Sequence, residues 1–220
     1  MINDQIEKFK EKLAKEKKLG LALDMDETLS FTIGYLIEEL IKKLGSPENL
    51  TAYEMARKYK HTDNIPYWQK DEANKIISEI ISSNEVQQNL PLIENADRIV
   101  KEINKIIPIV AYITVRSESV IDGTRFWLEK HGFPKAEIIA KPMEIARKDG
   151  NEWKAKTLEY LYPQVLGIVD DNPGLTKFFT KDYKGTVYLY DNEEKERKDI
   201  KIIPCKDWEM VAKKIKESVK

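Results

Sequence analysis

The amino-acid sequence predicts an α/β fold, in which a parallel sheet is covered by helices on both faces and a helical segment is inserted near the start. Short apolar runs of strand length alternate with helical patterns through the second half of the chain. Residues 30–90 contain helical patterns and no convincing strand. At 220 residues, the chain is long enough for a core domain plus an insertion. We therefore expect a core of residues 1–29 and 91–220 and a helical insertion of residues 30–90.

The first half of the chain contains one predicted strand among helices. Apolar residues at helical spacing predict helices at residues 2–17, 36–44, 71–82 and 95–106. The apolar run that ends at Leu23 predicts the first strand. Gly45 ends the second of these helices, and Thr51 with Glu54 forms a capping box that begins a further helix.

Strands and helices alternate in the second half. Apolar runs predict strands at residues 108–113, 138–140, 165–169 and 186–190. Helical patterns between them cover residues 117–131 and 154–161. Gly132 and Pro134 end the first of these two helices. Strands that alternate with helices in this way predict parallel pairing.

Composition and charge argue against several classes of protein. With 37 basic and 38 acidic residues, the net charge of -1 provides no general attraction to nucleic acid or to a membrane surface. Cys205 is the single cysteine, which excludes an internal disulfide. No apolar run approaches the roughly 20 residues of a membrane-spanning helix, and the charged start of the chain does not resemble a secretory signal. We expect a soluble, cytoplasmic protein without a nucleic-acid polymer or a membrane as partner.

Polar side chains follow several of the predicted strands. These side chains are Asp24 and Asp26 after the first strand, Thr114 after the second, and Asp170 and Asp171 after the strand at 165–169. Lys154 opens the helix before that last strand. Ligands of parallel α/β sheets bind at the carboxyl ends of the strands, so the sequence predicts one shared site. Crowded carboxylates repel one another unless a cation lies among them, and hard oxygen ligands suit Mg²⁺.

Such a set of side chains favours phosphoryl transfer. A threonine hydroxyl and a lysine ammonium beside a magnesium ion can hold a dianionic phosphoryl group. One carboxylate can attack phosphorus, while another two residues away protonates the leaving oxygen. The pattern therefore favours covalent catalysis through an aspartyl phosphate.

The order of these residues resembles the four motifs of the haloacid dehalogenase (HAD) superfamily of phosphohydrolases. The matching segments are LALDMDETL, IPIVAYIT, WKAKTL and GIVDDNPGL, spread from Leu19 to Leu175. Receiver domains use similar residues in another order, with an acidic pair first and the lysine last. The resemblance implies a three-layer, Rossmann-like core with a parallel sheet. It also implies that the insertion is a small α-helical cap domain that closes over the site.

The resemblance further implies roles for individual residues. Asp24 would be the nucleophile, and Asp26 would be the general acid and then the base that activates water. Thr114 and Lys154 would hold the transferring phosphoryl group. Lys156 is an alternative to Lys154, which we prefer because it lies at the base of the apolar face of its helix.

Metal binding is implied in the same way. Asp24, Asp170 and the backbone carbonyl of Asp26 would bind Mg²⁺, and Asp171 would assist directly or through water. Members without the second aspartate of the first motif tend to be dehalogenases or mutases, so the presence of Asp26 favours hydrolysis of a phosphoester.

Two nearby residues are less determined by the sequence. Arg116, two residues after Thr114, is a candidate to bind the phosphate or the leaving group through its planar guanidinium. Glu27 occupies a position where many members have glycine, and the sequence assigns it no role.

We therefore expect a magnesium-dependent phosphomonoester hydrolase acting on a small soluble phosphate ester, of which a nucleotide is one candidate. A phosphotransferase or phosphomutase on the same scaffold and a catalytically silent binding protein are the alternatives. Basic and aromatic residues between positions 53 and 70 could contact the substrate, or could be ordinary packing and surface residues. The sequence leaves the substrate and the oligomeric state open.

Overall fold

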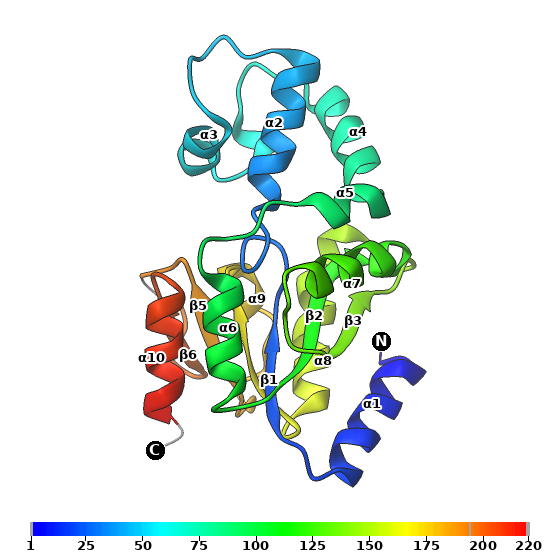
Figure 1. Ribbon diagram of the computed structural model, residues 1–220, viewed down its shortest axis with the longest axis vertical. Helices are drawn as coiled ribbons and strands as arrows, with labels where there is room; N and C mark the ends of the chain where they lie inside the picture. The colour runs from blue at the N-terminus through cyan, green and yellow to red at the C-terminus, as the bar shows by residue number, and fades with distance from the viewer. Residues whose placement is uncertain (1, 194, 219–220) are drawn as a thin grey trace.

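Parallel strands form the centre of the molecule. The computed structural model describes residues 2–193 and 195–218, in which six strands form one sheet of order β3-β2-β1-β4-β5-β6 (Figure 1). The strands are β1 (Gly20–Leu23), β2 (Ile109–Ser117), β3 (Glu137–Lys141), β4 (Val165–Asp170), β5 (Thr186–Tyr190) and β6 (Lys201–Cys205). Every pair of neighbouring strands is parallel. The predicted α/β fold with a parallel sheet is therefore confirmed.

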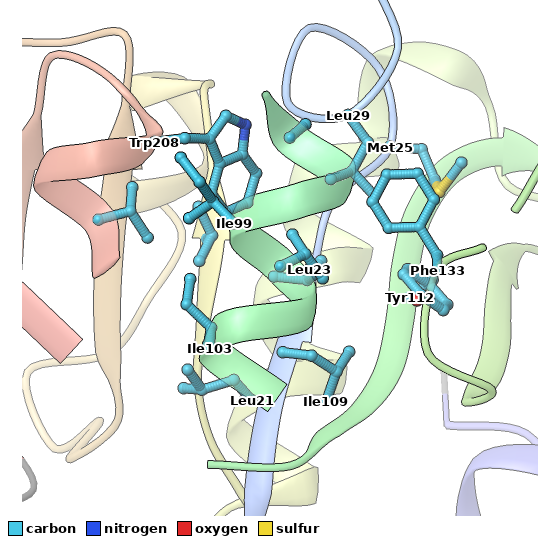
Figure 2. Close-up of a cluster of buried hydrophobic side chains, with 14 of the residues drawn as sticks. Leu21, Leu23, Met25, Leu29, Ile99, Ile103, Ile109, Tyr112, Phe133 and Trp208 are labelled. Carbon is cyan, nitrogen blue, oxygen red and sulfur yellow. The ribbon is translucent and has the colours of Figure 1, made fainter. Parts of the chain in front are cut away.

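Helices cover both faces of this sheet. They are α1 (Asp4–Lys15), α6 (Ala96–Asn104), α7 (Ile121–Lys130), α8 (Gly150–Leu161), α9 (Pro173–Thr176) and α10 (Trp208–Ser218). Leu21 and Leu23 of β1 point to the face covered by α6, α7 and α10, where Ile103 and Trp208 belong to the same cluster (Figure 2). Ala22 points to the opposite face, which α1, α8 and α9 cover. This alternation with a period of two residues gives β1 a buried side chain on both faces.

A separate group of helices lies beyond the carboxyl ends of the strands, at the top of Figure 1. The group contains α2 (Thr32–Leu44), α3 (Ala52–Tyr59) and α4 (Lys70–Ile81), and α5 (Asn84–Asn89) follows it. It has a hydrophobic cluster of its own, which includes Leu40, Met55 and Ile77. The predicted capping box is present, since the Thr51 side chain accepts from Glu54 N–H and the Glu54 carboxylate from Thr51 N–H.

Residues 30–90 are attached to the sheet domain next to the end of β1 and at α7. Phe31 N–H donates to the Pro91 carbonyl, and Ile93 N–H donates to the Leu29 carbonyl. The short helix α5 packs against α7, where the Asn84 side chain accepts a hydrogen bond of 2.6 Å from Gly123 N–H. Helices α2 to α4 are thus connected to the core through a narrow region next to the end of β1.

Several elements differ from the sequence prediction. Strand β2 continues to Ser117, beyond the predicted end at Ile113, because it pairs with β3 as far as Lys141. Helix α8 begins at Gly150, one turn before the predicted start. The edge strand β6, which contains Pro204, and helices α5 and α10 were not predicted. None of the helices in the described part of the chain is long and apolar enough to cross a membrane.

Candidate active site

The carboxyl ends of β1, β2 and β4 bring the predicted site residues to one place. Asp24 directly follows β1, and its backbone N–H donates to the Val169 carbonyl of β4 at 2.9 Å. Asp170 is the last residue of β4, and Thr114 lies in β2. Three adjacent strands in the order β2-β1-β4 therefore present these side chains at one edge of the sheet.

Lys154 links two of the carboxylates. Its ammonium nitrogen lies 2.7 Å from Asp24 Oδ1 and 2.8 Å from Asp170 Oδ2, and only 1% of the residue is exposed. Burial lowers the pKa of Lys154, but the attraction of Asp170 and Asp24 outweighs burial and raises that pKa above its usual value. Lys156, in contrast, has a side chain that is 59% exposed and pairs with Glu152. Lys154 is therefore the lysine that reaches this site.

Three carboxylates lie close enough to share a cation. Asp24, Asp170 and Asp171 each offer one oxygen, and these oxygens all lie within 4.8 Å of one another. Burial, with the nearby charge of Asp170, raises the pKa of Asp24 to about 7 despite the attraction of Lys154. Burial and Asp170 also raise the pKa of Asp171 well above its usual value. One ammonium thus balances only part of the negative charge of three carboxylates.

The donor set fits a divalent metal ion. Asp24 Oδ1 is buried and accepts no hydrogen bond from the described residues, although the Lys154 ammonium lies beside it. Hard carboxylate oxygens are the ligands that Mg²⁺ and Ca²⁺ prefer. The Asp26 side chain does not belong to this acidic group, and metal binding by its backbone carbonyl stays a prediction.

Arg116 contacts Asp26 in this structure. Its Nη2 lies 2.6 Å from Asp26 Oδ1, and its Nε lies 3.1 Å from both carboxylate oxygens. Burial raises the pKa of Asp26, but the attraction and the hydrogen bonds of Arg116 outweigh burial and lower it. The guanidinium also donates to Ser30 Oγ at 2.7 Å and to Thr124 Oγ1 at 3.2 Å. The pair with Arg116 therefore favours the carboxylate form of Asp26, and binding of phosphate by Arg116 stays a prediction.

Comparison with solved structures identifies the fold. A HAD-superfamily hydrolase from Ehrlichia chaffeensis superposes with a TM-score of 0.50 at 13% identity, over 92% of this chain and 99% of that one. This chain has the HAD fold. Protein Tyrosine Kinase A (PtkA) of Mycobacterium tuberculosis superposes with a TM-score of 0.53 at 13% identity, over 90% of this chain and 99% of that one. No protein-family model and no curated protein matches the sequence.

The HAD fold places Thr114 on the strand beside Asp24. Leu23 of β1 is paired with Tyr112 of β2, so Thr114 lies two residues farther along the neighbouring strand. Thr114 is buried, and its hydroxyl accepts a hydrogen bond of 3.2 Å from Arg116 N–H. The predicted residues Asp24, Thr114 and Asp170 thus come from neighbouring strands at one end of the sheet.

Further side chains, not predicted from the sequence, contact the carboxylates and Arg116 at this site. Thr28 is fully buried; its hydroxyl donates to Asp171 Oδ1 at 3.2 Å and accepts from Asp171 N–H at 3.1 Å. The Thr32 hydroxyl donates to Asp26 Oδ1. Thr28 lies inside the first motif, where its spacing from Asp26 was a usable signal. Thr124 carries no such signal, since only the packing of α7 brings it to Arg116.

Glu27 connects the first motif to the helices above the sheet. Its Oε1 accepts a hydrogen bond of 2.6 Å from Ile33 N–H. Ile33 lies in the first turn of α2, where backbone N–H groups have no acceptor within the helix. Its φ of 55° lies in the left-handed region, which favours glycine. Burial and the nearby Asp26 raise the pKa of Glu27 to about 8. The residue that the sequence left without a role therefore binds the start of α2.

Replacement of Glu27 tests the cost of this backbone conformation. We expect Glu27→Gly to be more stable than Glu27→Ala by about 1 kcal/mol, because both lack the carboxylate and only glycine adopts a positive φ without strain. Urea unfolding of the two variants measures the difference. At the helical position Lys156, the order should be reversed, since alanine is about 1 kcal/mol more favourable than glycine in a helix. If the alanine variant were the more stable one at both positions, the backbone at Glu27 would not be strained.

A cavity of about 610 Å³ lies between this end of the sheet and the helices above it. Its wall contains residues of the acidic group and of the motifs, including Asp24, Asp26, Arg116, Lys154 and Asp171. From the helical side it is lined by Ile33, Leu36, Lys60, His61 and Thr62. The candidate site therefore opens into a space with room for a small ligand, bounded by the strand ends and by the helices above them.

Proposed function

We propose that this protein is a magnesium-dependent phosphomonoester hydrolase that forms an aspartyl phosphate. The observation that carries the proposal is the buried Asp24 carboxylate, which lies at the end of β1 between the Lys154 ammonium and two further carboxylates. Its HAD fold and the cavity above it support the same function. The substrate would be a small soluble phosphate ester, and a nucleotide is one candidate.

The proposed reaction assigns two carboxylates to different tasks. An oxygen of Asp24 attacks phosphorus and the ester bond breaks. The leaving oxygen takes a proton from Asp26, which would first accept that proton from solvent, because its pair with Arg116 favours the carboxylate. In the second step Asp26 accepts a proton from water, whose oxygen attacks phosphorus and releases Asp24 with inorganic phosphate.

The positive charges of the site would support both steps. The Lys154 ammonium and the Thr114 hydroxyl would bind oxygens of the transferring group, and Arg116 would keep Asp26 in place. Asp24, Asp170, Asp171 and the backbone carbonyl of Asp26 would hold Mg²⁺, which when bound supplies positive charge for the phosphoryl oxygens.

Helices α2 to α4 would form the cap domain of this enzyme. They have a hydrophobic cluster of their own, and their residues line the upper wall of the cavity. In this position they would exclude water during the reaction and contact the leaving group.

A panel of phosphomonoesters tests the function. We expect release of inorganic phosphate in the presence of Mg²⁺ and none after treatment with EDTA, because the three carboxylates repel the substrate phosphate without a cation. Lack of turnover across a broad panel at saturating Mg²⁺ would contradict the proposal. Transfer of the phosphoryl group to a second substrate without phosphate release would instead indicate a phosphotransferase.

A further inference from the structure

The acidic residues of the cavity wall lie near Arg116 and Lys154, which pair with two of them, and the other basic residues of the wall come from different elements. Its acidic side chains, Asp24, Asp26, Glu27 and Asp171, all belong to the loops that follow β1 and β4. Lys141 and Arg147, which lie at and after the end of β3, are on the other side of β2. Lys60 lines the cavity from the helices above. The part of the cavity away from the acidic group therefore carries positive charge.

Lys141 is the buried member of this positive region. It is the last residue of β3 and is only 7% exposed. Its ammonium donates to the carbonyls of Pro142 at 3.0 Å and Ile145 at 2.6 Å, and it forms no ion pair with any residue in the ranges 2–193 and 195–218. An ammonium has three donors, so one remains for another partner. A buried charge without a counter-charge is costly, and an anion in the cavity would offset that cost.

The sheet order sets how far the backbone of β3 is from that of β1. Strand β2 lies between β1, which carries Asp24, and β3, which carries Lys141. Two strand spacings correspond to about 10 Å. Because the Lys141 ammonium is bound to the Pro142 and Ile145 carbonyls in the loop after β3, we infer that it would contact the far end of a small leaving group and not the transferring phosphoryl group.

We propose that Lys141 binds a second negatively charged group, a carboxylate or phosphate, on the leaving group of the substrate. This inference rests on the proposed function, because it assigns a substrate class to the same cavity. Arg147 and Lys60 add positive charge around that group without being buried. The substrates would therefore be small phosphate esters that carry a second anionic group at the end opposite the phosphate.

Non-hydrolysable ligands test this binding site independently of turnover. Benzylphosphonate and 4-carboxybenzylphosphonate differ only in the second anion, and their binding in the presence of Mg²⁺ can be measured by calorimetry. We expect the wild type to bind the carboxylated compound at least about 10-fold more tightly, the ratio that one charge-assisted hydrogen bond provides. Lys141→Met should abolish that preference.

Two further variants distinguish binding of the second anion by Lys141 from its hydrogen bonds to the Pro142 and Ile145 carbonyls. Lys141→Gln removes the charge but keeps donors for the Pro142 and Ile145 carbonyls, so it should fold and still lose the preference. Lys148→Met removes an exposed lysine that does not line the cavity, and it should keep the preference. Thermal unfolding of each variant checks that the fold is intact.

The outcomes distinguish this inference from the proposed function. An equal affinity of the wild type for both phosphonates, or a preference that persists in Lys141→Gln, would overturn the role of Lys141 whatever the enzyme hydrolyses. A preference that depends on Lys141, together with no turnover of any phosphomonoester, would overturn the proposed hydrolase and leave the anion site standing.

Discussion

Asp24→Asn is expected to lower magnesium-dependent phosphate release by at least about 10³-fold, the scale of loss on removal of a catalytic nucleophile. The amide keeps the shape of the side chain, but its nitrogen is not a nucleophile and its oxygen carries no charge. Asp24 lies at the end of β1 with Lys154 beside it, and the amide oxygen can still face that ammonium. Rates of phosphate release under saturating Mg²⁺ measure the effect.

A control variant tests whether the loss of phosphate release is specific to Asp24. Asp182→Asn changes an exposed aspartate in the loop before β5 and should leave the rate within about twofold, because surface substitutions have small effects. Thermal unfolding should show Asp24→Asn folded. If Asp24→Asn kept more than about a tenth of the wild-type rate, Asp24 would not be the nucleophile.

Lys154→Met is expected to destabilise the protein by about 3 to 5 kcal/mol in the absence of metal, as removal of one partner from a buried ion pair does. The ammonium lies between Asp24 and Asp170, which are 5% and 0% exposed, so its loss leaves two buried carboxylates without a counter-charge. Methionine is unbranched like lysine and fills the same space. Urea unfolding in EDTA measures the free energy of unfolding.

The neighbouring lysine provides the control. Lys156→Met removes an exposed pair with Glu152 and should change the free energy of unfolding by no more than about 0.5 kcal/mol. Addition of Asp24→Asn to Lys154→Met should recover part of the loss, because one of the unpaired charges is gone. Mg²⁺ should also recover part, since a bound cation stabilises the folded state. Equal effects of the two methionine variants would show that the Lys154 ion pairs do not stabilise the fold.

Much of the fold was predictable because it depends on local patterns. The apolar run before Asp24 predicted a buried strand, and Thr51 with Glu54 predicted the start of α3. Strand β6 was missed because Lys201 and Pro204 interrupt its apolar residues, so it is recognisable only from its pairing with β5. Strand β2 was predicted too short for a related reason, since pairing with Lys141 of β3 extends it to Ser117.

The site was predictable to the extent that order along the chain indicates position on the sheet. Asp24, Thr114 and Asp170 follow apolar runs, and parallel strands bring their carboxyl ends together. The partner of each side chain was not predictable in the same way. Arg116 could have turned toward the phosphate site or toward Asp26, and its direction depends on Ser30 and Thr124 from two other elements.

The sequence by itself predicted the α/β fold, the helical patterns of residues 30–90 and the candidate carboxylates, threonine and lysine, because hydrophobic periodicity and the order of the motifs are visible along the chain. Only the tertiary structure decided that Arg116 pairs with Asp26, that Glu27 binds the start of α2, and that the buried Lys141 ammonium is bound to two backbone carbonyls. These three contacts depend on which groups from distant parts of the chain are buried next to one another. Charges interact through space whatever their separation along the chain.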